Sequence, residues 1–286
     1  MKDRIDTLIA DRAPWLFQDT LPARLSRLVL NGMLGYESTI ALANEIGAMP
    51  ATDIMDIMAS HLAKHVAVSG LGHVPRHGAA LIVANHPTGI ADGIMLHALL
   101  RHVRPDAYFF ANHDILKMLP QMADRIAPVE WRKDRRSHGK TRETMAFTRM
   151  AVKEGRLGVI FPSGRLAKRR GMRLHERPWM ASAAMLARKF VLPVIPIHMQ
   201  ARNSALFYLF DAIHPTLRDI TLFHETLNKH RQPYDVRIGE TISPIALPEN
   251  SEDGIELLRR ATLALGEQKQ QGVSLWQSSR WSQRRV

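Results

Sequence analysis

The chain has 286 residues, with 39 Lys and Arg against 27 Asp and Glu, and a formal net charge of +12. Its 45% hydrophobic and 23% charged residues are typical of a globular protein long enough for a substantial core. The absence of cysteine excludes disulfides, thiolate-bound zinc, iron–sulfur clusters and a cysteine nucleophile. No stretch resembles a signal peptide or reaches the ~18–20 apolar residues of a spanning helix. We therefore expect a cytoplasmic protein that meets a membrane only from its surface.

The positive charge is concentrated in two stretches. Residues 132–142 hold six basic residues and one acidic residue, and residues 165–173 hold five basic residues and no acidic one. Such an excess favours an anionic partner, which could be nucleic acid, a lipid surface or an acidic carrier. The candidate membrane- or anion-binding residues are Trp15, Arg135, Arg136, Arg169, Arg170 and Trp281.

Residues 1–65 carry apolar residues at helical spacing, which predicts a helical segment. Two interpretations stay open: these helices pack on the core, or an amphipathic face with Trp15, Leu16 and Phe17 contacts a bilayer. From residue 66, short branched apolar runs alternate with helical stretches. Strands are predicted at 79–84, 107–110, 157–161, 192–197 and 235–238, and helices at 92–101, 140–154, 179–189, 216–228 and 252–268.

This alternation predicts an α/β fold: a mostly parallel central sheet flanked by helices, with an N-terminal helical extension. We expect two parts, residues 1–65 as the helical, possible membrane-associating segment and residues 66–286 as the α/β domain. Pro193 and Pro196 within the run 192–197 predict an edge strand or one that borders a cleft.

The first predicted strand ends in a candidate general base. Residues 84–93 read Ala-Asn-His-Pro-Thr-Gly-Ile-Ala-Asp-Gly, so the strand leads His86 into a Pro/Gly turn and Asp92 starts the next helix. A carboxylate beside an imidazole fixes its tautomer and stabilises the imidazolium. His86 and Asp92 are therefore the predicted catalytic pair, and Gly89 lets the loop fold back. In a structural alternative, His86 caps the helix and Asp92 is a solvated acid of its first turn.

Two further strand ends carry polar residues. Residues 161–165 read Phe-Pro-Ser-Gly-Arg, a turn whose backbone donors and neighbouring Lys168 suit an anionic head group or a carrier's phosphate. Alternatively, Arg165 belongs to a solvated basic loop. The run 192–197 is followed by Arg202 and Asn203. Ligands of open α/β sheets bind at such carboxyl ends of strands.

Taken in order, these blocks resemble the lysophospholipid (glycerolipid) acyltransferase family over residues 66–245. That family has a His with an acid four residues further in, a Phe-Pro-Glu-Gly-Thr-Arg turn and a Val-Pro-rich strand; its second block resembles residues 111–129 here. This chain places five residues between His86 and Asp92 and lacks the Glu of the turn. Both departures resemble a bacterial side branch, the hemolysin-like and ornithine-lipid acyltransferases.

The resemblance implies O-acyl transfer without a covalent acyl-enzyme, a cofactor or a metal: His86 deprotonates a lysolipid hydroxyl that attacks an acyl thioester. It implies acyl carrier protein or acyl-CoA as donor, a lyso-aminolipid or lysophospholipid as acceptor, and an anionic membrane surface at the inner face of the cytoplasmic membrane. The turns around Gly89 and Ser163 are candidate oxyanion donors. The candidate substrate-binding residues are Asn85, Thr88, Gly89, Asn112, Ser163, Gly164, Arg165, Lys168, Arg202 and Asn203.

Two other classes of function compete with this interpretation. A non-catalytic basic protein could bind nucleic acid or anionic membranes, but the chain shows no helix-turn-helix, zinc finger or aromatic platform, and no nucleic acid is expected. A metal hydrolase is disfavoured because the 14 histidines are scattered and no His-Glu-x-x-His occurs.

Overall fold

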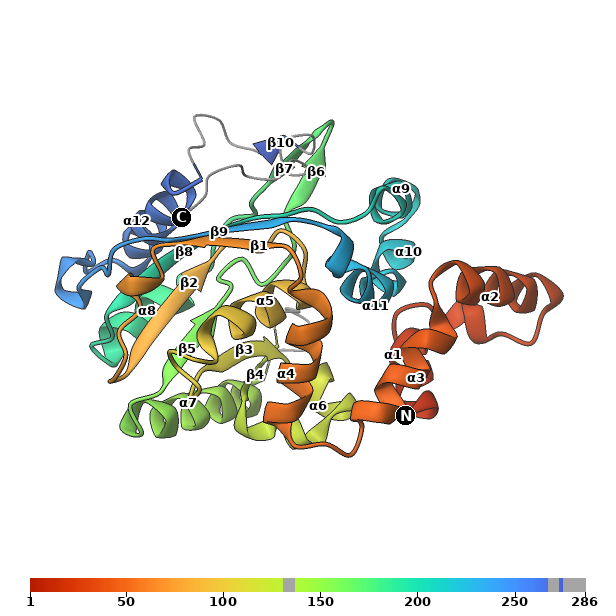
Figure 1. The fold of residues 1–286 in the computed structure, drawn as a ribbon, viewed down its shortest axis with the longest axis horizontal. Coiled ribbons are helices and arrows are strands. Elements are labelled where there is room, and N and C mark those ends of the chain that lie inside the picture. The colour runs from red at the N-terminus through yellow and green to blue at the C-terminus, as the bar shows by residue number, and fades with distance from the viewer. Residues whose placement is uncertain (131–136, 267–272, 275–286) are drawn as a thin grey trace.

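The computed structural model describes residues 1–130, 137–266 and 273–274, and Figure 1 shows its fold. The α-helices are α1 (Lys2–Ala10), α2 (Leu21–Met33), α3 (Tyr36–Ile46), α4 (Ala51–Leu62), α5 (Ile90–Leu100), α6 (Asp114–Met118), α7 (His138–Lys153), α8 (Ser182–Lys189), α9 (Ala205–Ile213), α10 (Pro215–Ile220), α11 (Leu222–Leu227) and α12 (Ser251–Ala264). The strands are β1 (Val66–Ser69), β2 (Ala80–Ala84), β3 (Tyr108–Asn112), β4 (Ile126–Val129), β5 (Leu157–Ile160), β6 (Lys168–Arg170), β7 (Arg173–His175), β8 (Val194–Gln200), β9 (Tyr234–Ile238) and β10 (Val273–Ser274). Short 3-10 turns include η1 (Pro14–Phe17) and η5 (Lys229–Arg231).

Seven strands form the central sheet, in the order β1-β9-β8-β2-β5-β3-β4. Neighbouring strands run parallel except β8 and β9, which are antiparallel. The prediction of a mostly parallel sheet flanked by helices is therefore confirmed. A second sheet consists of β6, β7 and β10, which pair in antiparallel fashion.

Helices bury both faces of the central sheet (Figure 1). Strand β2 supplies apolar side chains to both faces. Ile82 belongs to the core cluster that includes residues of α4 and α5, whereas Leu81 and Val83 belong to the cluster that includes residues of α7, α8 and α12. Successive side chains of a strand point to opposite faces, so a strand covered on both sides is apolar throughout. This is why the predicted strands appear in the sequence as continuous apolar runs.

Several elements differ from the prediction. The elements that lie outside the predicted ranges are strands β1, β4, β6, β7 and β10 and helices α6 and α9. The single helix predicted at 216–228 is two helices, α10 and α11. The break falls at Thr221, whose hydroxyl donates to the carbonyl of Arg218 at 2.6 Å. A side-chain hydroxyl that binds a carbonyl of the preceding turn competes with continuation of the helix.

Pro193, which precedes β8, and Pro196, which lies within it, do not mark an edge strand, because β8 lies between β9 and β2. Pro196 is accommodated where pairing with β9 is irregular: residues 195–196 lie opposite residues 239–241, between the pairs Val194–Ile242 and Ile197–Ile238. A proline inside a sheet is tolerated at such a bulge, where the ladder needs no N–H donor.

The N-terminal helices pack to different degrees. Helix α4 contributes to the core of the central sheet, and α1 and α3 share a small cluster with Ile5, Tyr36 and Ala43. Helix α2 buries only Ala23 and lies at the right edge of Figure 1, away from the sheet. Within the described ranges, no helix is long and apolar enough to cross a bilayer.

The three residues predicted to form a bilayer-facing surface are not equally exposed. Leu16 is buried in a cluster with Phe210 and Ile220, whereas Phe17 is half-buried and Trp15 is 39% exposed. Because these residues form one turn of η1, they point in different directions, and Leu16 cannot reach a bilayer.

Candidate active site

His86 and Asp92 lie in contact at the carboxyl end of β2. The Nδ1 atom of His86 lies 2.9 Å from Oδ2 of Asp92, whose side chain is fully buried in the first turn of α5. The loop between them turns at Gly89, whose φ of +97° is rarely adopted by residues with a side chain. The carboxylate accepts, so Nδ1 donates and the lone pair of Nε2 is left to take a proton.

Asp92 is held by the loop that it helps to fold. Its Oδ2 also accepts from the backbone N–H groups of Thr88 at 2.9 Å and Gly89 at 3.0 Å, and its Oδ1 accepts from the Thr88 hydroxyl at 2.5 Å. A buried carboxylate is stable only when hydrogen-bonded in this way. The alternative of a solvated first-turn acid is therefore wrong for Asp92.

The segments that follow β5 hold both the ring and the backbone of His86. Its ring stacks on Phe161 with centroids 4.3 Å apart, and its carbonyl accepts from the N–H of Ala167 at 2.9 Å. Its backbone N–H donates to Oε2 of Glu176 at 3.2 Å, while Oε1 accepts from the Trp179 indole at 3.0 Å. Burial raises the pKa of Glu176 despite these hydrogen bonds. The His86 side chain stays 17% exposed, which leaves one edge accessible.

The turn at residues 161–165 is closed by its own hydrogen bonds. The Gly164 N–H donates to the carbonyl of Phe161 at 2.9 Å, and the Ser163 hydroxyl donates to the carbonyl of Arg165 at 2.8 Å. These donors, like the two amides that bind Asp92, already have acceptors within the protein. The structure therefore does not offer them as oxyanion donors, because each hydrogen is already directed at another oxygen.

A cavity of about 1880 Å³ lies beside His86. We use the name polar wall for five of its charged lining residues, Arg165, Lys168, Arg177, Asp211 and Arg218. We use the name apolar wall for the lining residues Leu8, Ile46, Met55, Ile94 and Met118, which come from α1, α3, α4, α5 and α6. In the part of the chain that the structure describes, no group of three or more His, Asp or Glu side chains could hold a metal ion.

The polar wall carries an excess of positive charge. Burial lowers the pKa of Arg177, and the neighbouring charges of Arg165 and Arg218 act in the same direction. Asp211 opposes them, and its Oδ1 lies 3.2 Å from Nη1 of Arg218. Arg218 also pairs with Asp219, another lining residue, whose Oδ1 lies 2.7 Å from Nη2. Three guanidinium groups that repel one another gain from an anionic group placed among them.

The predicted substrate-binding residues fall into two sets. Those that line the cavity are Gly89, Asn112, Gly164, Arg165 and Lys168; those that do not are Asn85, Thr88, Ser163, Arg202 and Asn203. Asn85, for example, binds the backbone of Met199 in β8 through both its amide nitrogen, at 2.9 Å, and its oxygen, at 2.7 Å. Substrate contacts by either set stay predictions.

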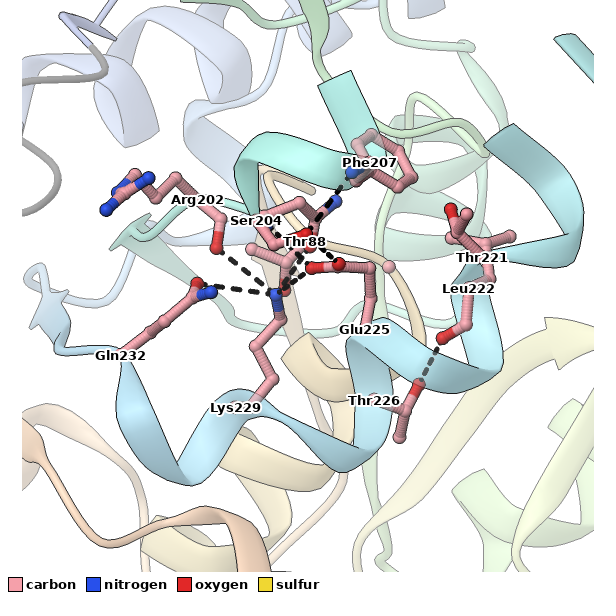
Figure 2. A network of polar contacts seen from close by, with 12 residues as sticks. Thr88, Arg202, Ser204, Phe207, Thr221, Leu222, Glu225, Thr226, Lys229 and Gln232 are labelled. Atoms are coloured by element: carbon pink, nitrogen blue, oxygen red, sulfur yellow. Dashed lines mark hydrogen bonds and ion pairs between the residues drawn. The ribbon is translucent and has the colours of Figure 1, made fainter. Parts of the chain in front are cut away.

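Arg202 and Asn203 belong to a buried network around Lys229, which Figure 2 shows. The Nζ atom of Lys229 donates to Oδ1 of Asn203 at 2.6 Å, to Oε2 of Glu225 at 3.0 Å and to the carbonyl of Arg202 at 3.2 Å. The backbone N–H and the hydroxyl of Ser204 both donate to the carboxylate of Glu225. Lys229 is 0% exposed and Glu225 is 1% exposed, so this ion pair is cut off from water.

The buried ion pair responds to burial and to its partners. Burial lowers the pKa of Lys229, and its partner Glu225 only partly offsets this. Burial also opposes the charged form of Glu225, but Lys229 and the Ser204 hydrogen bonds outweigh it and hold the pKa of Glu225 below its ordinary value. Like Glu225, the Asp92 carboxylate opposes the lowering of the Lys229 pKa by burial. The network therefore lies within electrostatic reach of the His86–Asp92 pair.

The predicted anion-binding residues are dispersed. Arg169 and Arg170 lie on β6, where the guanidinium of Arg169 is 5.9 Å from the ring centroid of Tyr208 and Arg170 is exposed. Trp15 lies in η1. Arg135, Arg136 and Trp281 lie outside the described residues.

Several residues of this region were not found from the sequence: Glu176, Arg177, Glu225, Lys229 and Tyr234. Glu225 and Lys229 have the four-residue spacing of a helical ion pair, a signal that was present. Glu176 lies ninety positions from the amide that it accepts from, and no local pattern links the two.

Comparisons with known proteins agree with this geometry. The Acyltransferase family model matches residues 65–200. A lyso-glycine lipid O-acyltransferase of Phocaeicola vulgatus is 23% identical over 206 residues, which cover 70% of each chain. Another, of Bacteroides thetaiotaomicron, is 24% identical over 166 residues, which cover 58% of this chain and 59% of that relative.

The crystal structure of the 1-acyl-sn-glycerophosphate (LPA) acyltransferase PlsC of Thermotoga maritima shares the fold. It matches with a TM-score of 0.52 and 13% identity, over 91% of this chain and 99% of that one. The molecule is thus an acyltransferase of α/β fold. Residues 65–200 match the Acyltransferase family, and the similarity to two lyso-glycine lipid O-acyltransferases supports O-acylation of a lysolipid as the activity.

Proposed function

We propose that the protein transfers an acyl group from a thioester to the hydroxyl of a lyso-aminolipid, with His86 as general base and Asp92 as its partner. The observation that carries this is the 2.9 Å contact between Nδ1 of His86 and the buried Asp92 carboxylate, beside the cavity. It leaves Nε2 to accept the proton of the hydroxyl as the acceptor oxygen attacks the thioester carbonyl. The new C–O bond forms, the C–S bond breaks, and Nε2 returns the proton to the departing thiolate.

The two walls of the cavity suit the two ends of such substrates. The apolar wall accommodates acyl chain, because burial of each methylene contributes about 0.8 kcal/mol. The polar wall suits a carboxylate head group, since Arg165, Arg177 and Arg218 gain from an anion between them. The similarity to two lyso-glycine lipid O-acyltransferases supports an amino-acid head group.

The acyl donor reaches the site past the hairpin of β6 and β7. Both candidate donors, acyl carrier protein and acyl-CoA, are anionic, and this hairpin exposes Lys168, Arg170 and Arg173. The N–H of Ala167, just before β6, donates to the carbonyl of His86. The basic hairpin therefore begins beside His86, the proposed catalytic residue, and its positive charges would hold a phosphate-bearing thioester there.

The acceptor class is tested by assaying purified protein with both donors and a panel of lysolipids. We expect a carboxylate-bearing lyso-aminolipid to be acylated in preference to lysophosphatidate. Arg165→Gln should raise the KM for that acceptor about tenfold, the loss expected for one hydrogen bond to a charged group. Arg149→Gln, an exposed arginine on α7 that does not line the cavity, is the matched control. Preference for lysophosphatidate, or an unchanged KM in Arg165→Gln, would contradict the assignment.

We further propose that α2 places the enzyme on an anionic bilayer, as part of a membrane-associating N-terminal segment. One face of this helix exposes Leu21, Leu25, Leu28, Val29 and Met33. The exposed apolar side chains of an interfacial helix bury themselves at the headgroup boundary. A lysolipid acceptor is itself held in a bilayer, which makes lipid the occupant that this face fits. The division of the chain at residue 65 stays a prediction. Helix α4, which precedes that point, packs within the core of the central sheet.

Cosedimentation with phosphatidylglycerol-containing vesicles tests this surface. Leu25→Glu/Leu28→Glu should lose most vesicle binding, because two carboxylates would have to enter the interface. The control Ser38→Glu/Asn44→Glu adds the same charge at exposed positions of α3 and should bind as the unmodified protein does. Equal binding by both variants would show that α2 does not contact lipid.

A further inference from the structure

Two buried hydroxyl groups form a chain of hydrogen bonds to Asp92, at the carboxylate oxygen that does not contact His86. The Thr88 hydroxyl lies 2.5 Å from Oδ1 of Asp92, and the hydroxyl of Tyr234 lies 2.5 Å from that of Thr88. Thr88 is 2% exposed and Tyr234 is 1% exposed. Neither Thr88 nor Tyr234 lines the cavity, so this pair contacts the proposed base only through Asp92.

The direction of the hydrogen bonds in this line follows from its chemistry. The Asp92 carboxylate can only accept, so the single proton of the Thr88 hydroxyl points at Oδ1. The oxygen of Thr88 must then accept from the phenol of Tyr234. Burial, together with the neighbouring Asp92 carboxylate, raises the pKa of Tyr234 well above its ordinary value, so the phenol keeps its proton and stays a donor.

Tyr234 is anchored to the sheet rather than to the loop that it supports. It is the first residue of β9, pairs in register with Val66 of β1, and its N–H donates to the carbonyl of His65 at 2.9 Å. Its side chain belongs to the core cluster of the sheet. Asn85 is bound to Met199 of β8, so the segment that carries His86 is fastened to β8 and to β9, which both lie on the same side of β2 in the sheet.

The two oxygens of Asp92 therefore have different tasks. Oδ2 receives Nδ1 of His86 and the two amides of the loop, while Oδ1 receives the Thr88 hydroxyl at 2.5 Å. The phenol of Tyr234 also interacts directly with the Asp92 carboxylate, which helps to raise the pKa of Tyr234. Without that hydroxyl, Oδ1 would lose its 2.5 Å hydrogen bond, and the carboxylate would gain from rotating toward another donor, such as the phenol of Tyr234. Rotation would turn Oδ2 away from His86.

We propose that Thr88 and Tyr234 are positioning residues for acyl transfer: Tyr234 orients the Thr88 hydroxyl, and Thr88 fixes the rotation of the Asp92 carboxylate that orients His86. This inference rests on the proposed role of His86 as the base. It assigns Thr88 to the support of the base rather than to contact with the acceptor.

Steady-state kinetics of four variants test this line of hydroxyls. Thr88→Val keeps the shape of the side chain but removes the donor, and should lower kcat about tenfold or more with the acceptor KM within about twofold. Thr88→Ser restores the hydroxyl and should recover kcat to within about threefold of the unmodified enzyme. Tyr234→Phe should lower kcat less than Thr88→Val, because Thr88 can still donate.

The double variant Thr88→Val/Tyr234→Phe separates a positioning role from general loss of stability. If Tyr234 acts through Thr88, its removal costs nothing further in kcat once the Thr88 hydroxyl is gone, so the two effects are not additive. The midpoint of thermal unfolding should be no lower in the double variant than in Thr88→Val, since the phenol that lost its acceptor is removed as well.

The proposal would be overturned by additive losses in the double variant, by failure of Thr88→Ser to recover kcat, or by a rise in the acceptor KM at constant kcat in Thr88→Val. Such a rise in KM would instead make Thr88 a substrate contact. Full activity of Thr88→Val beside an inactive His86→Ala would refute the positioning role alone. Activity retained by His86→Ala would refute the proposed base itself.

Discussion

Replacing His86 by alanine is expected to lower kcat/KM for acyl transfer by about 10²- to 10⁴-fold, the contribution of a positioned general base. The imidazole is the group that joins the buried Asp92 to the cavity, through a 2.9 Å contact on one side and an accessible edge on the other. Its removal leaves the acceptor hydroxyl without a base, while both walls of the cavity keep their side chains. The loss should therefore fall on kcat rather than on KM.

The measurement needs a control for the fold and for the loss of any histidine. His77→Ala removes an exposed histidine from the loop before β2 and should leave the rate unchanged. Thermal unfolding of His86→Ala should resemble that of the unmodified protein to within a few degrees, because the side chain is partly exposed and Asp92 keeps its donors from Thr88 and Gly89. A folded His86→Ala with near-normal activity would contradict the assignment.

Replacing Lys229 by methionine is expected to lower the free energy of unfolding by about 3–5 kcal/mol, the usual effect of removing one partner of a buried ion pair. Methionine preserves most of the volume, so the loss comes from the carboxylate of Glu225, which stays buried without its counter-charge. Asn203 and the carbonyl of Arg202 lose their donor as well. Denaturant titration measures the change.

Two further variants make this result specific. Glu225→Gln in the Lys229→Met background removes the stranded charge and should recover a large part of the loss, because replacing both partners of a buried pair is often nearly neutral. Lys117→Met breaks an ion pair with Asp114 in which Lys117 is half-exposed, and should cost less than about 1 kcal/mol. Equal losses for Lys229→Met and Lys117→Met would show that the buried pair contributes no more than a surface one.

The placement of this ion pair bears on catalysis. The structure buries two carboxylates, Asp92 and Glu225, near a single buried ammonium, Lys229. The three groups together carry one net negative charge, which an imidazolium would neutralise if His86 takes up a proton as we propose. A low-dielectric surrounding strengthens that compensation.

Local sequence determined much of the fold and the pairing at its centre. The apolar runs of β2, β5 and β8 were predicted within a few residues, because a strand covered on both faces must be apolar throughout. His86 and Asp92 were paired correctly, since only six positions and one glycine turn separate them. The excess of charge was placed in two stretches from composition alone, and Arg165 and Lys168 of the second one line the cavity.

The sheet order determined the rest. Tyr234 reaches Thr88 across 146 positions and Glu176 reaches His86 across 90, because β9, which is separated from β2 by β8, and the segment after β7 come close to the loop after β2 only once the chain has folded. Hydrogen bonds and ion pairs between such distant residues leave no periodic trace in the sequence. The sequence by itself therefore determined the class of fold and the pairing of His86 with Asp92, the proposed base and its partner. Only the tertiary structure decided which side chains surround that pair, which of the predicted binding residues face the cavity, and which are used within the protein, since these depend on contacts between strands that are neighbours in space and not along the chain.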